Sequence, residues 1–224
     1  MPHVLRTLIA MLIFASGVHM SQCHAVECHG AIRVGYRGGT GAVGDLTFAD
    51  LTPNIPLRLR IGLGYARLNP GNPEEAREIF INNATNGTPE RSGRVWDYAL
   101  DMLFPLRGSG PLQLWTATGP RHARFTGNFK YVGGNEDFDI TCHQWGWGIG
   151  LESRTRMGSS AQLLLSAGVD KFFNAPLQGH DTSYSPDGES VNAREDFDYE
   201  SADAAIHQPQ VRLRLMAGVG FRLN

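Results

Sequence analysis

The chain is poor in the residues that mark several large classes of protein. Only three of its 224 residues are cysteine, and their spacing matches no zinc motif. No run of 18 apolar residues follows the N-terminal segment, which excludes a membrane-spanning helix there. The 20 Lys and Arg nearly balance the 22 Asp and Glu, which argues against a nucleic-acid partner. The length fits one domain, and we expect no metal and no cofactor.

The N-terminal segment, residues 1–25, has the order of a secretory signal peptide. A short basic start precedes the apolar run Leu8–Phe14, and Cys23-His24-Ala25 offers a cleavage site. Gln22 does not fit a lipid-attachment motif. The sequence therefore predicts export, with residues 26–224 as the mature domain. Of the two cysteines left there, Cys28 and Cys142, we expect no disulfide, because the predicted topology puts them at opposite ends of non-adjacent strands.

The last stretch, Gln210–Asn224, alternates strictly between two kinds of residue. Every odd position from Val211 to Leu223 is apolar, whereas the even positions carry arginine, methionine or glycine. Period-two alternation over more than a dozen residues predicts one long β-strand with two unlike faces. A strand of about 9–11 residues with a continuous apolar face is what crossing a bilayer in a barrel requires.

The segment Leu57–Leu68 repeats this pattern, with leucine, isoleucine and tyrosine on one face and arginine and glycine on the other. A soluble β-sandwich or lipocalin-like cup would bury the apolar face, whereas a membrane barrel turns it toward lipid. No helical layer is available to cover a sheet, which favours the barrel. We predict an all-β fold, an eight-stranded antiparallel up-and-down transmembrane β-barrel. Its strands are expected near 31–37, 43–51, 57–68, 94–106, 112–132, 139–155, 161–173 and 210–224.

The connections differ in length in a regular way. Met157–Ser160 and Arg107–Gly110 are short turns, whereas Asn69–Gly93 and Asn174–Gln208 are long loops that the strand count places at the opposite end. Asn72 followed by Pro73 predicts a short helix from Glu74 to about Asn83. This helix either packs on the barrel rim or acts as a lid or partner-binding element. Gly119-Pro120 predicts a bulge in the fifth strand.

The C-terminal residues Gly218, Phe221 and Leu223 resemble the assembly signal of bacterial outer-membrane barrels, although Met216 stands where a polar residue is usual. In layout the chain is similar to the small eight-stranded barrels of the OmpA and OmpX type. The resemblance implies a place in the bacterial outer membrane. It also implies recognition by the barrel assembly machinery and contact with outer-membrane lipid and lipopolysaccharide.

The predicted register collects eleven charged residues inside the barrel, and these must pair and hydrogen-bond to be tolerated there. They are Arg33, Arg37, Arg58, Arg60, Asp97, Asp101, Glu152, Arg154, Asp170, Arg212 and Arg214. Eight strands enclose a space just wide enough for side chains to fill. We interpret the set as a charge network that fills the lumen; the alternative is a narrow anion or sugar pore.

Candidates for catalysis are few. Some outer-membrane barrels of this size are lipid A deacylases or acyltransferases that use histidine and serine with a carboxylate. Here His180, Asp181 and Ser183 share the last loop and His143 lies near the outer end of the sixth strand, but sequence adjacency is not triad geometry. The last loop is also acidic without a calcium spacing. We predict a structural or surface-interaction role with an unknown surface ligand, and a lipid A-modifying enzyme as the alternative.

Overall fold

The structure is a computed structural model of the chain. It describes residues 26–51, 55–107, 110–158 and 160–223. The predicted signal peptide, residues 1–25, lies outside the described residues, as does the last residue, Asn224.

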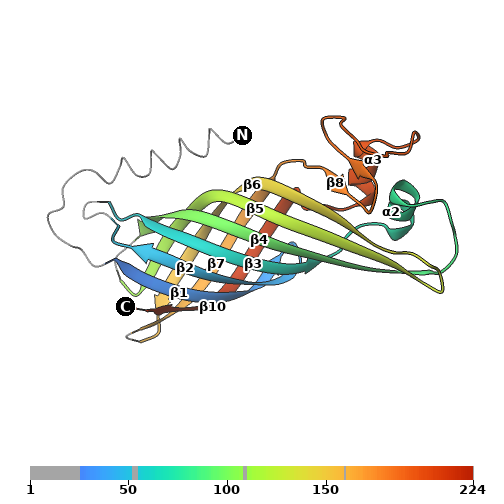
Figure 1. Cartoon of the computed structure of the whole chain (residues 1–224). Helices are drawn as coiled ribbons and strands as arrows, with labels where there is room; N and C mark the ends of the chain where they lie inside the picture. Colours follow the sequence, from blue (N-terminus) through green and yellow to red (C-terminus); the bar gives the residue numbers. More distant parts are fainter. Residues whose placement is uncertain (1–25, 52–54, 108–109, 159, 224) are drawn as a thin grey trace.

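Eight long strands form one closed antiparallel barrel (Figure 1). Each strand pairs with its neighbours along the chain, and the first pairs with the last in the register Ile32–Val219. This closure confirms the predicted fold. The barrel strands are β1 (Glu27–Arg37), β2 (Thr40–Ala49), β3 (Arg58–Leu68), β4 (Thr88–Arg107), β5 (Leu112–Val132), β6 (Asp137–Arg156), β7 (Ala161–Phe172) and β10 (Val211–Arg222).

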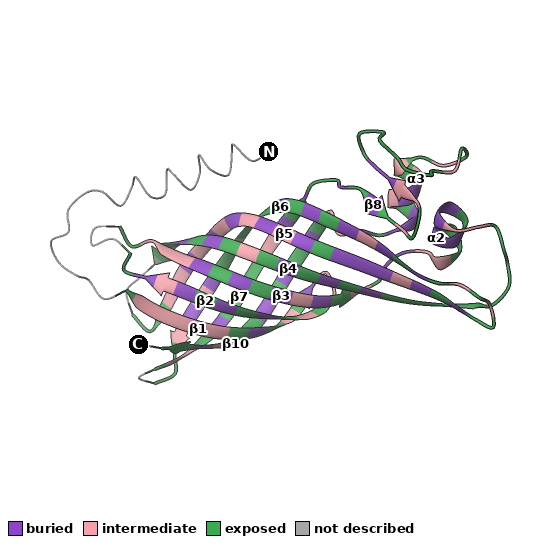
Figure 2. Ribbon diagram, in the orientation of Figure 1, coloured by how far each residue is buried: buried purple, intermediate pink, exposed green. Residues whose placement is uncertain are grey.

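Burial alternates along each strand in the sense of a membrane barrel (Figure 2). In β10 the side chains of Val211, Leu213 and Leu215 are each about 60% exposed, whereas Arg212 between them is 1% exposed. A soluble barrel would have the reverse arrangement, because its apolar side chains would fill the core. The outer wall of this barrel is therefore apolar and its interior is charged.

Aromatic side chains gather on the outer wall toward one end. Trp96 and Tyr98 of β4 and Trp145 and Trp147 of β6 are all exposed there, and Tyr65 lies 4.9 Å from Trp96 between ring centroids. Amphipathic rings in such a row are typical of the boundary between hydrocarbon and water. Strands β4, β5 and β6 continue beyond the row.

The two ends of the barrel are built differently. At the end where β1 begins and β10 finishes, which we call the turn end, the strands are joined through residues 50–57, 108–111 and 157–160. The opposite end, which we call the cap end, carries the two long loops. The separation of short turns from long loops is incomplete, because β1–β2 and β5–β6 also join at the cap end through only residues 38–39 and 133–136.

The first long loop contains the predicted helix. Helix α2 (Pro73–Phe80) starts at Asn72, whose side chain accepts a hydrogen bond from the backbone N–H of Glu74 at 3.1 Å. It ends three residues earlier than expected. Among the described residues, no helix is both long and apolar enough to cross a membrane.

The second long loop is more structured than the sequence indicated. It contains the short strands β8 (Leu177–Gln178) and β9 (Ser183–Tyr184), which extend the sheet from β6, and helix α3 (Tyr199–Ala205). Asp198 caps α3 by accepting from the backbone N–H of Ser201 at 2.8 Å. Helix α3 has seven residues, of which two alanines are buried. So short a segment shows too weak a periodicity of apolar residues to be recognised as a helix from the sequence.

The bulge predicted at Gly119-Pro120 is wrong. The β4–β5 ladder omits the pairs opposite these residues and resumes in the same register, from Ala99–Arg121 to Met102–Thr118. The register shifts instead between Pro105 and Arg107. Gly119 is required for close approach, because a Cβ there would lie 1.9 Å from the carbonyl oxygen of Leu100.

The two cysteines of the described chain lie apart. Cys142 is buried near the cap end, where its sulfur lies 3.0 Å from Gln208 Oε1, whereas Cys28 is the second residue of β1, at the turn end. No disulfide joins Cys28 to Cys142, as the topology predicted.

A closed barrel of this kind should resist unfolding in cold detergent, because every barrel strand is hydrogen-bonded on both sides. We expect unboiled protein in sodium dodecyl sulfate to migrate faster than boiled protein on a gel. A single band, unchanged by boiling, would contradict the closed barrel.

Candidate functional site

The interior of the barrel holds one cluster of charged side chains, which we call the lumen cluster. Every barrel strand contributes at least one member, and each member is less than 10% exposed. The lumen cluster consists of Arg33, Arg37, Asp45, Arg60, Asp97, Asp101, Arg121, Glu152, Arg154, Asp170, Arg212 and Arg214.

Two carboxylates each serve three arginines. Glu152 accepts from Arg33 at 2.8 Å and from Arg154 at 2.7 Å, and it also pairs with Arg60. Three arginines around one carboxylate offset the cost of burying that carboxylate, since each supplies a charge-assisted hydrogen bond.

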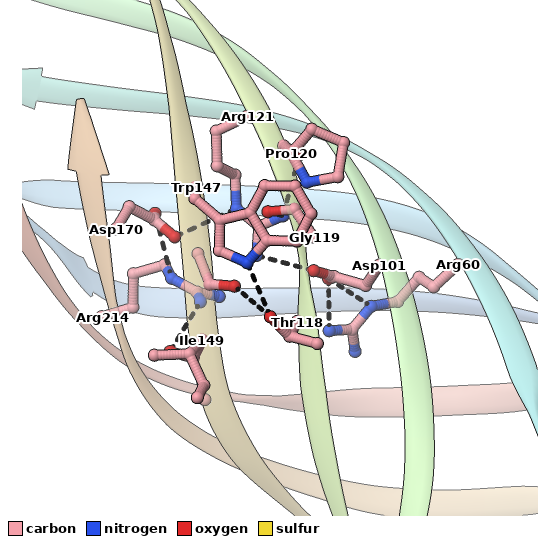
Figure 3. A network of polar contacts seen from close by, with 12 residues as sticks. Arg60, Asp101, Thr118, Gly119, Pro120, Arg121, Trp147, Ile149, Asp170 and Arg214 are labelled. Carbon is pink, nitrogen blue, oxygen red and sulfur yellow. Dashed lines mark hydrogen bonds and ion pairs between the residues drawn. The ribbon is translucent and has the colours of Figure 1, made fainter. Parts of the chain in front are cut away.

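Asp170 is the second such carboxylate, nearer the cap end. The guanidinium groups of Arg121 and Arg214 each lie 3.0 Å from its oxygens, and that of Arg212 lies at 3.3 Å. Figure 3 shows Asp170 with Arg121 and Arg214 on either side. The partners come from β5 and β10, so one side chain on β7 connects strands on both of its sides.

Two further carboxylates join the arginine groups around Glu152 and Asp170 into one network. Asp101 lies 2.7 Å from both Arg60 and Arg121 (Figure 3). Asp97 pairs with Arg37 and lies 3.2 Å from Arg212. Each ion pair therefore shares a partner with the next, and the interior is cross-linked around its whole circumference.

Ten of the eleven predicted interior residues belong to this network. The exception is Arg58, which is only half-buried and lies at the turn end, where its guanidinium carbon stacks 4.2 Å from the ring centroid of Trp115. Sequence reasoning missed Asp45, because the register of the second strand was uncertain. It missed Arg121, because Gly119-Pro120 obscured the alternation that continues through Ala117, Arg121 and Ala123.

Glycines on the inner face make room for the arginines. A Cβ at Gly148 would lie 2.3 Å from Asp170 Oδ1 and 2.5 Å from Arg121 Nη2, and one at Gly168 would lie 2.8 Å from Arg214 Nη2. Interiors are packed closely enough that even one added methyl group is felt. The alternation of glycine with arginine is therefore a packing pattern.

Above the lumen cluster the interior becomes apolar. Along β5 the inward side chains change from Arg121 to Ala123, Phe125, Phe129 and Tyr131, all buried. They pack with side chains of both long loops in one cluster, which we call the cap core. Its other members include Ile79 and Phe80 of α2, Phe138, Ile140, Phe172, Leu177, Tyr184, Ala202, Ala205 and Ile206.

A buried arginine connects α2 to the β5–β6 end of the barrel through hydrogen bonds and ring stacking. Arg77, 2% exposed, donates to the carbonyl of Asn86 at 2.9 Å and to Glu136 Oε2 at 2.7 Å. Its guanidinium carbon stacks 4.1 Å from the ring centroid of Tyr131. The hydrogen bond from Arg77 holds the pKa of Glu136 below its usual range. The first loop therefore packs on the rim, as one of its two interpretations proposed.

The structure does not bring the catalytic candidates together. His180 Nδ1 lies 2.9 Å from Asp181 Oδ2, and both side chains are more than three-quarters exposed. His143 is exposed on the outer wall, with its ring 5.9 Å from that of His122. Because Gln178 pairs with Thr141 in an antiparallel ladder, the chain at His180 has moved away from His143. Within the described chain, no hydrogen bond joins either histidine to Ser183 or another serine.

Three acidic residues of the second loop make contacts within the loop itself. Asp187 pairs with Ser185, Asp198 caps α3, and Asp203 accepts from Gln210 at 2.6 Å. Among the described residues, no three His, Cys, Asp or Glu side chains gather in a way that could hold a metal ion.

Of the three residues that resemble an assembly signal, Gly218 has a packing role. Gly218 faces inward, and a Cβ there would lie 2.1 Å from the carbonyl oxygen of Ile32 across the closing pair of strands. Phe221 and Leu223 are 49% and 60% exposed. The close approach of the two strands therefore explains why glycine stands at position 218, independently of any recognition by an assembly machinery.

Asp170→Asn removes the charge that three arginines share while keeping the side-chain shape. We expect the free energy of unfolding to fall by about 3–5 kcal/mol, because a broken buried pair leaves uncompensated charge. Urea unfolding in lipid vesicles, followed by tryptophan fluorescence, measures this loss. The exposed substitution Glu90→Gln is the control, and an equal effect of the two variants would contradict the network.

Gly148→Ala tests the packing of glycine against arginine. The added methyl group meets the Asp170–Arg121 pair, so we expect a loss of about 1–3 kcal/mol in unfolding free energy. The matched control is Gly44→Ala, since a Cβ at Gly44 has no heavy atom within 4 Å. Equal unfolding midpoints for the two variants in the same urea titration would show that Gly148 is not needed for space.

A scan against protein-family models found no match, and no curated protein matches the chain. Solved structures do match. A major outer membrane protein from Thermus thermophilus aligns over 89% of this chain and 100% of its own, with 23% identity and a TM-score of 0.73. Neisserial surface protein A and Ail of Yersinia pestis each align at 11% identity over 88% of this chain and 96% and 97% of theirs, with a TM-score of 0.41. By its likeness to the Thermus protein, the chain has the fold of a small bacterial outer-membrane barrel.

Proposed function

We propose that the chain is an exported outer-membrane protein that does not conduct, and that its role is structural or interactive at the cell surface. In this proposal residues 1–25 direct export, the apolar wall faces lipid, and the cap end lies outside the cell in contact with lipopolysaccharide. The C-terminal residues Gly218, Phe221 and Leu223 serve assembly.

The observation that carries the proposal is that the interior is filled at two levels. Twelve charged side chains, each under 10% exposed, occupy the part of the barrel within the apolar wall. The cap core then fills the interior beyond them, with Phe125, Phe129 and Phe172 completely buried. Eight strands leave little space beyond their own side chains, so a water-filled path would require both levels to rearrange.

The outer-membrane location is supported by the apolar wall and by the row of aromatic side chains toward one end of that wall. The wall has exposed leucine, valine and isoleucine on β1, β3, β6, β7 and β10. Soluble monomeric proteins rarely expose a continuous apolar surface of this extent to water. The fold shared with the Thermus outer membrane protein supports the same location. The folded cap, with two helices and the β8–β9 pair, supplies the surface for interaction.

Conductance across a planar bilayer tests the proposal. We expect the refolded full chain to give no stepwise currents at a protein concentration at which a sixteen-stranded porin gives them readily. The same preparation must show heat-dependent migration, so that silence reports a folded barrel. Regular unitary steps from the heat-modifiable protein would overturn the filled lumen and favour the narrow pore.

A further inference from the structure

The turn end of the barrel contains a polar cavity that the lumen cluster does not occupy. Its volume is about 280 Å³. The ends of β1, β3, β5, β6, β7 and β10 surround it at the mouth of the barrel interior. Among the side chains that line it are Arg58, Arg156, Arg222, Glu27 and His29.

Positive charge is in excess in this cavity. Its one carboxylate, Glu27, pairs with Arg222 at 2.9 Å and lies 3.4 Å from His29 Nε2. Across the described ranges of the chain, no carboxylate lies within ion-pair distance of Arg58 or Arg156. Three guanidinium groups therefore line the cavity against one carboxylate, and that carboxylate is paired with Arg222.

Arg58 is held in place and is incompletely hydrogen-bonded. Its guanidinium carbon lies 4.2 Å from the ring centroid of Trp115, and Arg154 lies 5.6 Å from the same ring. The Nη1 atom of Arg58 is buried without a hydrogen-bond partner. A buried donor without an acceptor is costly, and an anion in the cavity would supply the missing acceptor.

The lumen cluster behind the cavity adds to the positive potential. It contains seven arginines and five carboxylates, which is an excess of two positive charges in a region shielded from water. Charges act over longer distances where the effective dielectric constant is low. Arg154 is the member of the cluster that lies closest to Arg58 in this respect, because both guanidinium groups contact the ring of Trp115. Its positive charge therefore adds to the potential in the cavity.

We propose that this cavity binds a phosphate-type oxyanion through Arg58 and Arg156. Guanidinium forks match phosphate oxygens in pairs, and a dianion would form ion pairs with both Arg58 and Arg156. The amides of Gln113 and Gln162 also line the cavity and can donate to further oxygens of a tetrahedral group. Free phosphate and the phosphate of a lipid headgroup share this chemistry. The site goes beyond the surface role proposed above and does not depend on whether the barrel conducts.

Calorimetric titration of the refolded full chain with inorganic phosphate tests the site, in a detergent without phosphate groups. We expect saturable binding that Arg58→Gln and Arg156→Gln each weaken about tenfold or more, because each removes a charge-assisted hydrogen bond. Arg156 is exposed, so its substitution leaves folding intact, and heat-dependent migration verifies this for both variants. The control is Arg94→Gln, exposed toward the cap end. Absence of binding, or equal affinity in all four proteins, would overturn the proposal.

Competition then distinguishes the two sources of phosphate. Phosphatidic acid is added to the phosphate-bound protein in micelles, and oleate at the same mole fraction serves as an anion without phosphate. Displacement by phosphatidic acid alone supports a lipid headgroup as the occupant, and displacement by neither supports free phosphate. Equal displacement by oleate would overturn selectivity for phosphate.

Discussion

Ion pairing inside a space that side chains fill is the interaction on which this barrel depends. Within the apolar wall the lumen cluster takes the place of a hydrophobic core, so the interior side chains there must hold the strands together by other means. Here they do so with shared carboxylates: Glu152 and Asp170 each serve three arginines, and Asp101 joins the two groups. Buried ion pairs are costly when incomplete, so the network favours the single register in which all eight strands contribute. The inner glycines follow from the same constraint, because long arginine side chains need neighbours without a Cβ.

Toward the cap end the interior between the same strands changes from charged to apolar. Beyond the aromatic row the outer wall becomes polar, with exposed Arg94, Arg124 and His143, and there the usual rule of an apolar interior applies again. Strand β5 shows the change within a few residues, from Arg121 in the lumen cluster to Phe125 and Phe129 in the cap core. The helices and short strands of the long loops cover this apolar segment. The barrel is thus membrane-like along one part of its length and resembles a small soluble domain along the rest.

Period-two alternation was enough to predict the barrel, its wall and ten members of the lumen cluster, because each strand face repeats one kind of residue over its whole length. Prediction failed where that repeat was interrupted. Glycine and aspartate obscured the second strand, so Asp45 was missed, and Gly119-Pro120 hid Arg121. Helix α3 and the β8–β9 pair were missed because their stability comes from packing against the cap core, which no local pattern reveals. Which carboxylate meets which arginine also depends on register between strands, and this requires the structure.

The continuous ladder between β5 and β6 has a mechanical consequence. Their pairing runs without a shift from Leu112–Thr155 to Lys130–Asp137, so the backbone that carries the cap core is the same backbone that lines the lumen. A hinge needs a few residues that can change their dihedral angles freely, and the β5–β6 ladder leaves no unpaired residue between its ends. The part of the cap core that β5 and β6 carry is therefore fixed relative to the lumen, and a partner that contacted it would lose little free energy to ordering these two strands.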